Sequence, residues 1–180
     1  MAAAWIQSKV TDGMSAIDAT AGTGEDTCLL AECVGALGRV YAFDVQQSAL
    51  AQTEDKLKAR GLLERVTLFH QGHETLGTIP VIREDPCIAG IMFNLGYLPG
   101  SDHQVATSAD TTLTAVRTAL TLLMPRGVMT LCLYRHPGGD AESRQVEAWA
   151  AALGRGYNVH KIETINKNNP PYLIVVEKTE

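Results

Sequence analysis

A short glycine-rich turn next to acidic residues is the first feature of the sequence that could hold a ligand. The segment Asp18-Ala-Thr-Ala-Gly-Thr-Gly24 joins an apolar run to a helical pattern that starts at Glu25. Glycine at positions 22 and 24 permits a tight turn and a close approach of a ligand to the backbone. Dinucleotide sites share this layout, although only two of the three glycines of their fingerprint are present here.

The acids behind the turn indicate which kind of cofactor it would hold. A pyrophosphate at this helix N-terminus would meet the carboxylates of Glu25 and Asp26, which is an unfavourable arrangement of charge. A cationic sulfonium with a zwitterionic methionine tail tolerates these acids, so the turn favours S-adenosylmethionine over NAD. The residues of this segment that we expect in the cofactor site are Asp18, Thr20, Ala21, Gly22, Gly24, Asp26 and Thr27.

A second acid supports the same cofactor. Asp44 ends the apolar run that starts at Arg39, about 20 residues beyond the glycines, where a carboxylate can accept both ribose hydroxyls of an adenosine. The alternative is that Asp44 only caps the helix that begins near Gln47. Val45 and Gln46 follow directly and are expected to line the adenine pocket.

The apolar run that starts at Val66 leads into the segment Phe69-His-Gln-Gly-His-Glu74, which is rich in polar side chains. Gln71, His73 and Glu74 are expected to contact the adenine. His70 and His73 could suggest a metal site, but two histidines with one acid on a loop are a weak ligand set. We therefore predict adenine contact and no metal.

The segment Asn94-Leu-Gly-Tyr97 has the layout of the Asn/Asp-Pro-Pro-Tyr loops of amino-methylating enzymes. In such a loop the amide carbonyl accepts a hydrogen bond from the target amine, which keeps the nitrogen lone pair aimed at the methyl group. The ring of Tyr97 could stack on a base. The loop has no cysteine, which argues against methylation at carbon 5 of a pyrimidine. The alternative is that Asn94 forms a turn before Gly96.

Polar residues that follow the apolar runs Ile88–Phe93 and Val128–Tyr134 are candidate substrate contacts. Asp102 and His103 could orient the amine or collect its proton, since a neutral histidine titrates near pH 6.5. Arg135 and His136 could contact phosphate or the target nucleoside, the alternative being a simple turn between a strand and a helix. We predict Asn94, Tyr97 and His103 as catalytic residues, and we expect Asn94 to contact the cofactor as well. The predicted substrate contacts are Gly96, Leu98, Asp102, Arg135, His136, Asn169 and Tyr172. For Asn169 and Tyr172 a role in a hairpin turn is the preferred interpretation.

The elements that must position these residues alternate along the chain. Strands are predicted at Met14–Asp18, Arg39–Asp44, Val66–His70, Ile88–Phe93, Val128–Tyr134, Tyr157–Thr164 and Tyr172–Glu177. Helices are predicted at Glu25–Val34, Gln47–Arg60, Ser108–Met124 and Ala141–Leu153. Buried strands separated by helices indicate a parallel sheet covered on both faces. The last two strands are joined by a connection too short for a parallel crossover, so they should form an antiparallel hairpin.

Composition limits the class of protein. Hydrophobic residues make up 46% and charged residues 19%, which is typical of a soluble globular domain, and we expect a single domain over residues 1–180. No apolar run reaches the roughly 18 residues of a membrane span. Four scattered cysteines are expected to be reduced thiols of a cytoplasmic protein. The net charge of −5 argues against broad nucleic-acid binding and favours a homodimer, in which a second subunit supplies extra surface.

Taken together, the motifs resemble the YtqB/MnmM-type methyltransferases, long labelled rRNA methylases. The resemblance extends from Met14 to Lys178 and rests on Asp18-Ala-Thr-Ala-Gly-x-Gly-x-Asp-Thr27, Phe43-Asp-Val-Gln46, His73-Glu74, Phe93-Asn-Leu-Gly-Tyr-Leu-Pro-Gly100, His136-Pro-Gly-Gly139 and Asn169-Pro-Pro171. Gln71-Gly72 and Thr23 depart from the pattern, since relatives commonly carry an acid and a small polar residue at the former and often Asn at the latter.

The resemblance implies an α/β class I methyltransferase fold, which is Rossmann-like. Its seven-stranded, mostly parallel sheet has helices on both faces and a C-terminal antiparallel hairpin. It also implies S-adenosylmethionine as cofactor and the tRNA anticodon stem-loop as partner, with methylation of 5-aminomethyluridine to 5-methylaminomethyluridine at the wobble position. An rRNA or a small-molecule amine is the alternative acceptor. Relatives often have more chain before the first strand, so part of a substrate-side lid is expected to be absent.

Overall fold

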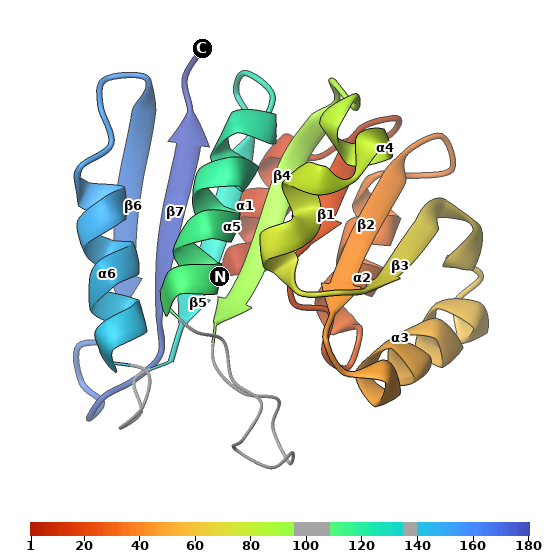
Figure 1. Ribbon diagram of the computed structural model, residues 1–180, viewed down its shortest axis with the longest axis horizontal. Coiled ribbons are helices and arrows are strands. Elements are labelled where there is room, and N and C mark those ends of the chain that lie inside the picture. The colour runs from red at the N-terminus through yellow and green to blue at the C-terminus, as the bar shows by residue number, and fades with distance from the viewer. Residues whose placement is uncertain (96–108, 135–139) are drawn as a thin grey trace.

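The computed structural model describes residues 1–95, 109–134 and 140–180 and contains one seven-stranded sheet (Figure 1). The strand order is β3-β2-β1-β4-β5-β7-β6. The strands are β1 (Ser15–Asp18), β2 (Arg39–Asp44), β3 (Val66–His70), β4 (Ile88–Leu95), β5 (Val128–Leu133), β6 (Tyr157–Glu163) and β7 (Tyr172–Lys178). The helices are α1 (Ala2–Lys9), α2 (Glu25–Cys33), α3 (Gln47–Ala59), α4 (Pro80–Arg83), α5 (Ala109–Leu122) and α6 (Asp140–Ala151), with 3-10 turns at Leu63–Arg65 and His73–Thr78.

The predicted topology is confirmed. The first five strands of the chain pair in parallel, whereas β7 runs antiparallel to both β5 and β6. The carboxyl ends of the parallel strands therefore share one edge of the sheet with the β6–β7 connection, as the lower edge of Figure 1 shows. Ligands of such sheets bind outside the carboxyl ends of the strands. We call this the carboxyl edge.

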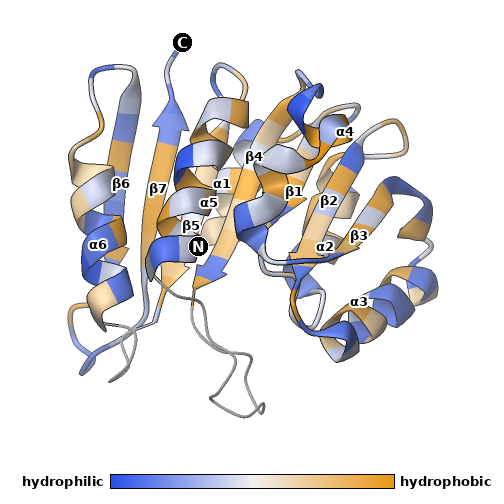
Figure 2. Cartoon of the chain, viewed as in Figure 1, coloured by the Kyte–Doolittle hydropathy of each residue, from blue (hydrophilic) through white to orange (hydrophobic). Residues whose placement is uncertain are grey.

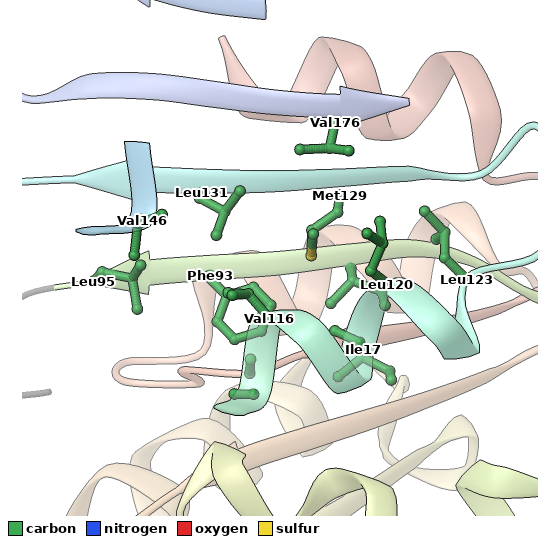
Figure 3. Packing of buried hydrophobic residues seen from close by; sticks show 14 of the residues in the cluster. Ile17, Phe93, Leu95, Val116, Leu120, Leu123, Met129, Leu131, Val146 and Val176 are labelled. Carbon is green, nitrogen blue, oxygen red and sulfur yellow. The ribbon is translucent and has the colours of Figure 1, made fainter. Parts of the chain in front are cut away.

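Helices cover both faces of the sheet. In Figure 1, α5 and α6 lie in front of it and α1 and α2 lie behind it. The front core contains Ile17, Phe93, Leu131 and Val116 (Figure 3), and the rear core contains Ile6 of α1 and Leu30 of α2. Figure 2 shows the central strands as mainly hydrophobic, whereas α3 and α6 mix both kinds of residue. Strands buried on both faces explain the continuous apolar runs in the sequence.

The connection between β3 and β4 differs from the sequence analysis, which predicted no helix there. It contains the 3-10 turn His73–Thr78 and the short helix α4, with Pro80 at the start of α4. Leu76 and Ile82 anchor this connection because both are fully buried in the front core. Both elements are too short to produce the repeating apolar pattern by which a longer helix is predicted.

Gly24 has a structural role that the sequence did not reveal. It adopts φ +83°, and a Cβ there would lie 2.9 Å from Cα and Oγ1 of Thr53 in α3. The hydroxyl of Thr53 in turn donates to the carbonyl of Gly22 at 3.1 Å. The absent side chain therefore lets α3 pack against the turn, whereas we had expected it to give a ligand access to the backbone.

We predict that Gly24→Ala destabilises the fold by about 1 to 3 kcal/mol more than Gly13→Ala. Gly13 has the same φ of +83° but nothing within 4 Å of its Cβ position, so both variants share the cost of left-handed backbone and only Gly24→Ala meets Thr53. Urea unfolding of the two variants measures the difference. Equal losses of stability would contradict the packing role.

Candidate active site

Asp18 is buried beneath the glycine turn. It is 0% exposed; its Oδ1 accepts the N–H of Thr20 at 3.1 Å and its Oδ2 accepts the hydroxyl of Thr27 at 2.6 Å. The pKa of Asp18 is raised from 3.8 to about 7, mainly by burial and also by the nearby Asp26 and Asp44 carboxylates, while the two hydrogen bonds lower it. Because its two oxygens accept hydrogen bonds from the turn and from α2, the buried Asp18 carboxylate fixes the turn relative to that helix.

Asp44 links the end of β2 to the same turn. Its Oδ2 accepts the N–H of Gly22 and its Oδ1 accepts the N–H of Gln46, both at 2.8 Å. Gln46 is the N-cap of α3, and no side chain caps that helix. Asp44 is therefore not the N-cap of α3. Its carboxylate instead accepts hydrogen bonds from the N-cap residue Gln46 and from Gly22 in the glycine turn. This places its carboxylate at the carboxyl edge beside the glycines.

Two neighbouring acids in the first turn of α2 point to different elements. Glu25 is exposed and forms ion pairs with Lys56 at 2.6 Å and Arg60 at 3.4 Å, both in α3. Asp26 instead contacts Asn94 in β4. The electrostatic argument against a pyrophosphate therefore rests on Asp26 alone, because the charge of Glu25 is compensated and faces away. Surface ion pairs of this kind contribute little to stability.

Asn94 lies inside β4, where it is paired with Cys132 of β5, so it is not a turn former. Its backbone N–H donates to Oγ1 of Thr20 at 2.7 Å, and its Nδ2 donates to Oδ2 of Asp26 at 2.5 Å. Strands β1 and β4 are neighbours in the sheet, which brings the glycine turn and Asn94 side by side at the carboxyl edge. The amide is thereby held at the place where a substrate would meet the cofactor.

Three of the five residues expected around the adenine, His73, Val45 and Gln71, differ in how far they are buried. His73 is 7% exposed, and its Nε2 has no hydrogen-bond partner among the described residues. Burial lowers the pKa of His73, so its ring is neutral at physiological pH. Val45 directly follows Asp44 and is 53% exposed. Gln71 is exposed, and its Oε1 accepts the hydroxyl of Thr75 at 3.0 Å.

These features fit an adenosine group. Buried polar atoms are nearly always hydrogen-bonded in folded proteins, and Nε2 of His73 and Oγ1 of Thr130 are the two exceptions among the described residues. Asp44 offers carboxylate acceptors, and Val45 offers an apolar surface for a flat ring. No group of three or more metal-ligating side chains occurs in the described parts of the chain, and the expectation of a metal-free site stays a prediction.

Two residues at the site were not predicted from the sequence. Tyr134 follows β5 at the carboxyl edge and is 43% exposed; partial burial, the Cys132 thiol and the Asp26 carboxylate together raise its pKa to about 12. Glu142 of α6 is 5% exposed and accepts the hydroxyl of Thr112 in α5 at 2.6 Å. The position of Tyr134 at the end of an apolar run was an available signal, whereas nothing in the sequence set Glu142 apart.

The substrate residues are only partly placed. Gly96, Tyr97, Leu98, Asp102, His103, Arg135 and His136 lie outside the described residues. Asn169 has φ +47° in the β6–β7 turn and lines an open depression together with Lys167 and Asn168. Tyr172 is 3% exposed, and its hydroxyl donates to Oε2 of Glu147 at 3.2 Å. A packing role therefore accounts for the position of Tyr172.

The basic side chains at the C-terminal end of α3 form ion pairs with acidic side chains of the same protein. Lys56 and Arg60 pair with Glu25, and Lys58 pairs with Glu54 at 2.6 Å.

No helix in residues 1–95, 109–134 and 140–180 is long and apolar enough to cross a membrane.

Comparison with known proteins identifies similar chains over most of the length. A family model described as "Putative rRNA methylase" matches residues 40–177. A chloroplastic tRNA (mnm(5)s(2)U34)-methyltransferase of Arabidopsis thaliana is 36% identical over 95% of this chain, which spans 65% of the length of that relative. A "putative rRNA-methylase" from Clostridium thermocellum is 36% identical with a TM-score of 0.92, covering 98% of this chain and 94% of its own. A methyltransferase structure from Streptococcus mutans, in complex with SAH, is 34% identical with a TM-score of 0.88 over the same shares.

The raised pKa of Asp18 predicts a pH-dependent stability that Asp18→Asn removes. The folded state favours the protonated acid, so this contribution is complete below pH 3.8 and is lost as the pH rises through about 7. Between these values the native chain should lose up to about 1.4 kcal/mol per pH unit relative to Asp18→Asn. The variant keeps both hydrogen bonds because the Thr27 hydroxyl can accept from the new amide.

Urea unfolding of both proteins at several pH values between about 4 and 8 measures this difference. Parallel stability curves for the two proteins would show that the pKa of Asp18 is the same in the folded and unfolded states.

Proposed function

The chain belongs to the rRNA methylase family, and from this premise we propose that it is an S-adenosylmethionine-dependent methyltransferase whose acceptor is an amine carried by RNA. The observation that supports this most is the placement of Asn94 at the carboxyl edge, where Thr20 accepts its backbone N–H and Asp26 accepts its side-chain amide. An amide in that position matches an amine acceptor better than a hydroxyl or a carbon acceptor, because its carbonyl can hold an N–H while the nitrogen lone pair faces the cofactor.

The cofactor would be held by residues at the ends of β2 and β3. Asp44 would exchange its bond to Gly22 for the ribose hydroxyls, Val45 would lie against the adenine, and the Nε2 of His73 would receive a partner. Asp18 and Thr27 would support the turn without direct contact, since both of their side chains are fully buried. When bound, the cofactor supplies an electrophilic methyl group on a sulfonium.

The chain contributes position and desolvation. Asn94 would align the neutral amine in line with the methyl group. Such positioning alone can lower the activation barrier by several kcal/mol. A strong general base is not required because the amine reacts as its neutral form. The product ammonium then releases its proton to water or to a nearby histidine, for which His103 remains the candidate.

The specific acceptor we propose is 5-aminomethyluridine at the tRNA wobble position, giving 5-methylaminomethyluridine. The motif resemblance and the activity named for the Arabidopsis relative support it. The anticodon loop would approach the carboxyl edge, with Lys167 and the asparagines of the β6–β7 turn beside it. Because the chain carries a net charge of −5, we propose that a second copy in a homodimer contributes RNA-binding surface, and that the enzyme acts in the cytoplasm.

An rRNA or a small-molecule amine is the second candidate acceptor. The acidic net charge favours a small molecule, because it gives little general attraction for phosphate. The family description favours rRNA.

We predict that Asn94→Ala lowers the turnover number about 100-fold while leaving the affinity for S-adenosylmethionine within about 2-fold. The substitution removes the amine acceptor but leaves the residues assigned to the cofactor. Asp44→Asn is the matched comparison and should weaken cofactor binding about 10-fold. Calorimetry and single-turnover kinetics measure the two effects, and an Asn94→Ala enzyme with native turnover would refute the catalytic role.

We further predict that the purified protein methylates a synthetic anticodon stem-loop carrying 5-aminomethyluridine at its wobble position and not the same stem-loop carrying uridine. Mass spectrometry of the digested nucleosides should show 5-methylaminomethyluridine only in the first case. Ribosomal RNA and free 5-aminomethyluridine are the comparison substrates. Preferred methylation of either one would assign the enzyme to that acceptor instead.

A further inference from the structure

We propose that Asp26 is a positioning residue that fixes the amide of Asn94 with its carbonyl oxygen toward the substrate amine. This inference rests on the proposed function, because it explains how the same site selects an amine. The contact joins the first turn of α2 to the end of β4, across 68 positions of sequence. It is therefore a product of the fold and not of local geometry.

The orientation follows from the chemistry of the two side chains. A carboxylate can only accept hydrogen bonds, whereas an amide donates through its nitrogen and accepts through its oxygen. Nδ2 of Asn94 faces Oδ2 of Asp26 at 2.5 Å, so Oδ1 of Asn94 must point away from Asp26. Without Asp26, a rotation of the amide by half a turn would exchange the two groups and present a donor to the substrate. A donor there would compete for the nitrogen lone pair that attacks the methyl group.

Asp26 is itself held in place by its neighbours on the helix. Glu25 on one side is paired with Lys56 of α3, and Thr27 on the other side donates to the buried Asp18. The backbone of Asn94 is fixed independently, since its N–H donates to Thr20. Donor and acceptor thus have little freedom to separate, and the amide keeps one orientation before any substrate arrives.

The carboxylate also changes the amide electrically. A hydrogen bond to an ionised acceptor is roughly twice as strong as a neutral one, and it polarises the group that donates it. Electron density on Oδ1 of Asn94 rises as Nδ2 donates to Asp26. An amine that gains positive charge as its new N–C bond forms is stabilised by that oxygen more than the neutral amine is, so the benefit falls on the turnover number and not on substrate binding.

Asp26→Asn tests the proposal with an isosteric change that removes the obligatory acceptor. We expect the turnover number at saturating S-adenosylmethionine to fall about 10- to 100-fold, with the KM for the amine substrate within about 3-fold. Glu25→Gln is the matched control: it removes the same charge one residue earlier, but its side chain contacts α3 and not Asn94. Its turnover number should stay within about 2-fold of the native value.

The exchange variant Asp26→Asn with Asn94→Asp separates positioning from a general structural role. Asn94→Asp alone places two carboxylates against each other and should inactivate the enzyme. In the double variant the amide at position 26 donates to the carboxylate at position 94, so an oxygen again faces the amine. We expect at least about 10-fold recovery of turnover over Asn94→Asp alone. An exchange variant no better than Asn94→Asp would overturn the proposal.

A measurement without substrate keeps this test distinct from the test of the proposed function. The side-chain NH2 signal of Asn94 in an amide NMR spectrum is identified by its loss in Asn94→Ala. In the native protein it should lie apart from those of solvent-exposed asparagines, and Asp26→Asn should move it toward them while Glu25→Gln leaves it in place. An unmoved signal in Asp26→Asn overturns the inference even if every amine assay succeeds. If no amine is methylated and the signal moves as expected, the orientation stands and the proposed function fails.

Discussion

The buried carboxylate of Asp18 is the constraint on which the rest of the site depends. It accepts one hydrogen bond from the turn at Thr20 and one from helix α2 at Thr27, so the end of β1, the turn and the helix move as one unit. Thr20 in turn accepts the backbone N–H of Asn94, which extends the unit to β4. If the turn shifted, both the glycine positions and the amide at the carboxyl edge would shift with it.

This arrangement concentrates negative charge where little protein charge compensates it. Asp26 and Asp44 both raise the pKa of Asp18, which means that each of them repels the Asp18 carboxylate in the free protein. Strain of this kind is common at functional sites, because a ligand of opposite charge relieves it. A sulfonium and an ammonium on one cofactor would supply positive charge to this turn, whereas a pyrophosphate would add to the repulsion. The electrostatics of the turn thus select among cofactors that share the same backbone shape.

The sequence predicted the sheet well because each strand is buried on both faces and leaves a continuous apolar run. The parallel pairing of the first five strands and the antiparallel hairpin followed from the connections between strands, whereas the strand order was not predicted. The connection between β3 and β4 was missed because its buried residues, Leu76 and Ile82, lie on turns too short to show a period. At the site, the positions of Asp44 and Asn94 at strand ends were predictable from where the runs stop.

What the sequence could not supply was the direction of each side chain. Glu25 and Asp26 are two neighbouring acids that the sequence does not distinguish. In the structure Glu25 pairs with Lys56 of α3, whereas Asp26 contacts Asn94. Gly24 looked like a ligand-facing glycine and instead makes room for Thr53. Both distinctions depend on how α3 packs against the turn, which is a contact between segments some 30 positions apart. Pattern within a single segment carries no information on such a contact.

Helix geometry explains why one short segment can serve three elements at once. Consecutive helical residues diverge by about 100° around the axis, so Glu25, Asp26 and Thr27 must face three directions. Here the three directions meet α3, β4 and β1, because the first turn of α2 starts at the point where these elements converge. A substitution at one of these positions therefore breaks the side-chain contact with one neighbouring element, while the other two contacts keep the helix in place. Chemistry at Asn94 can depend on Asp26 without the fold depending on it, which is the condition under which a positioning residue can be separated from a structural one.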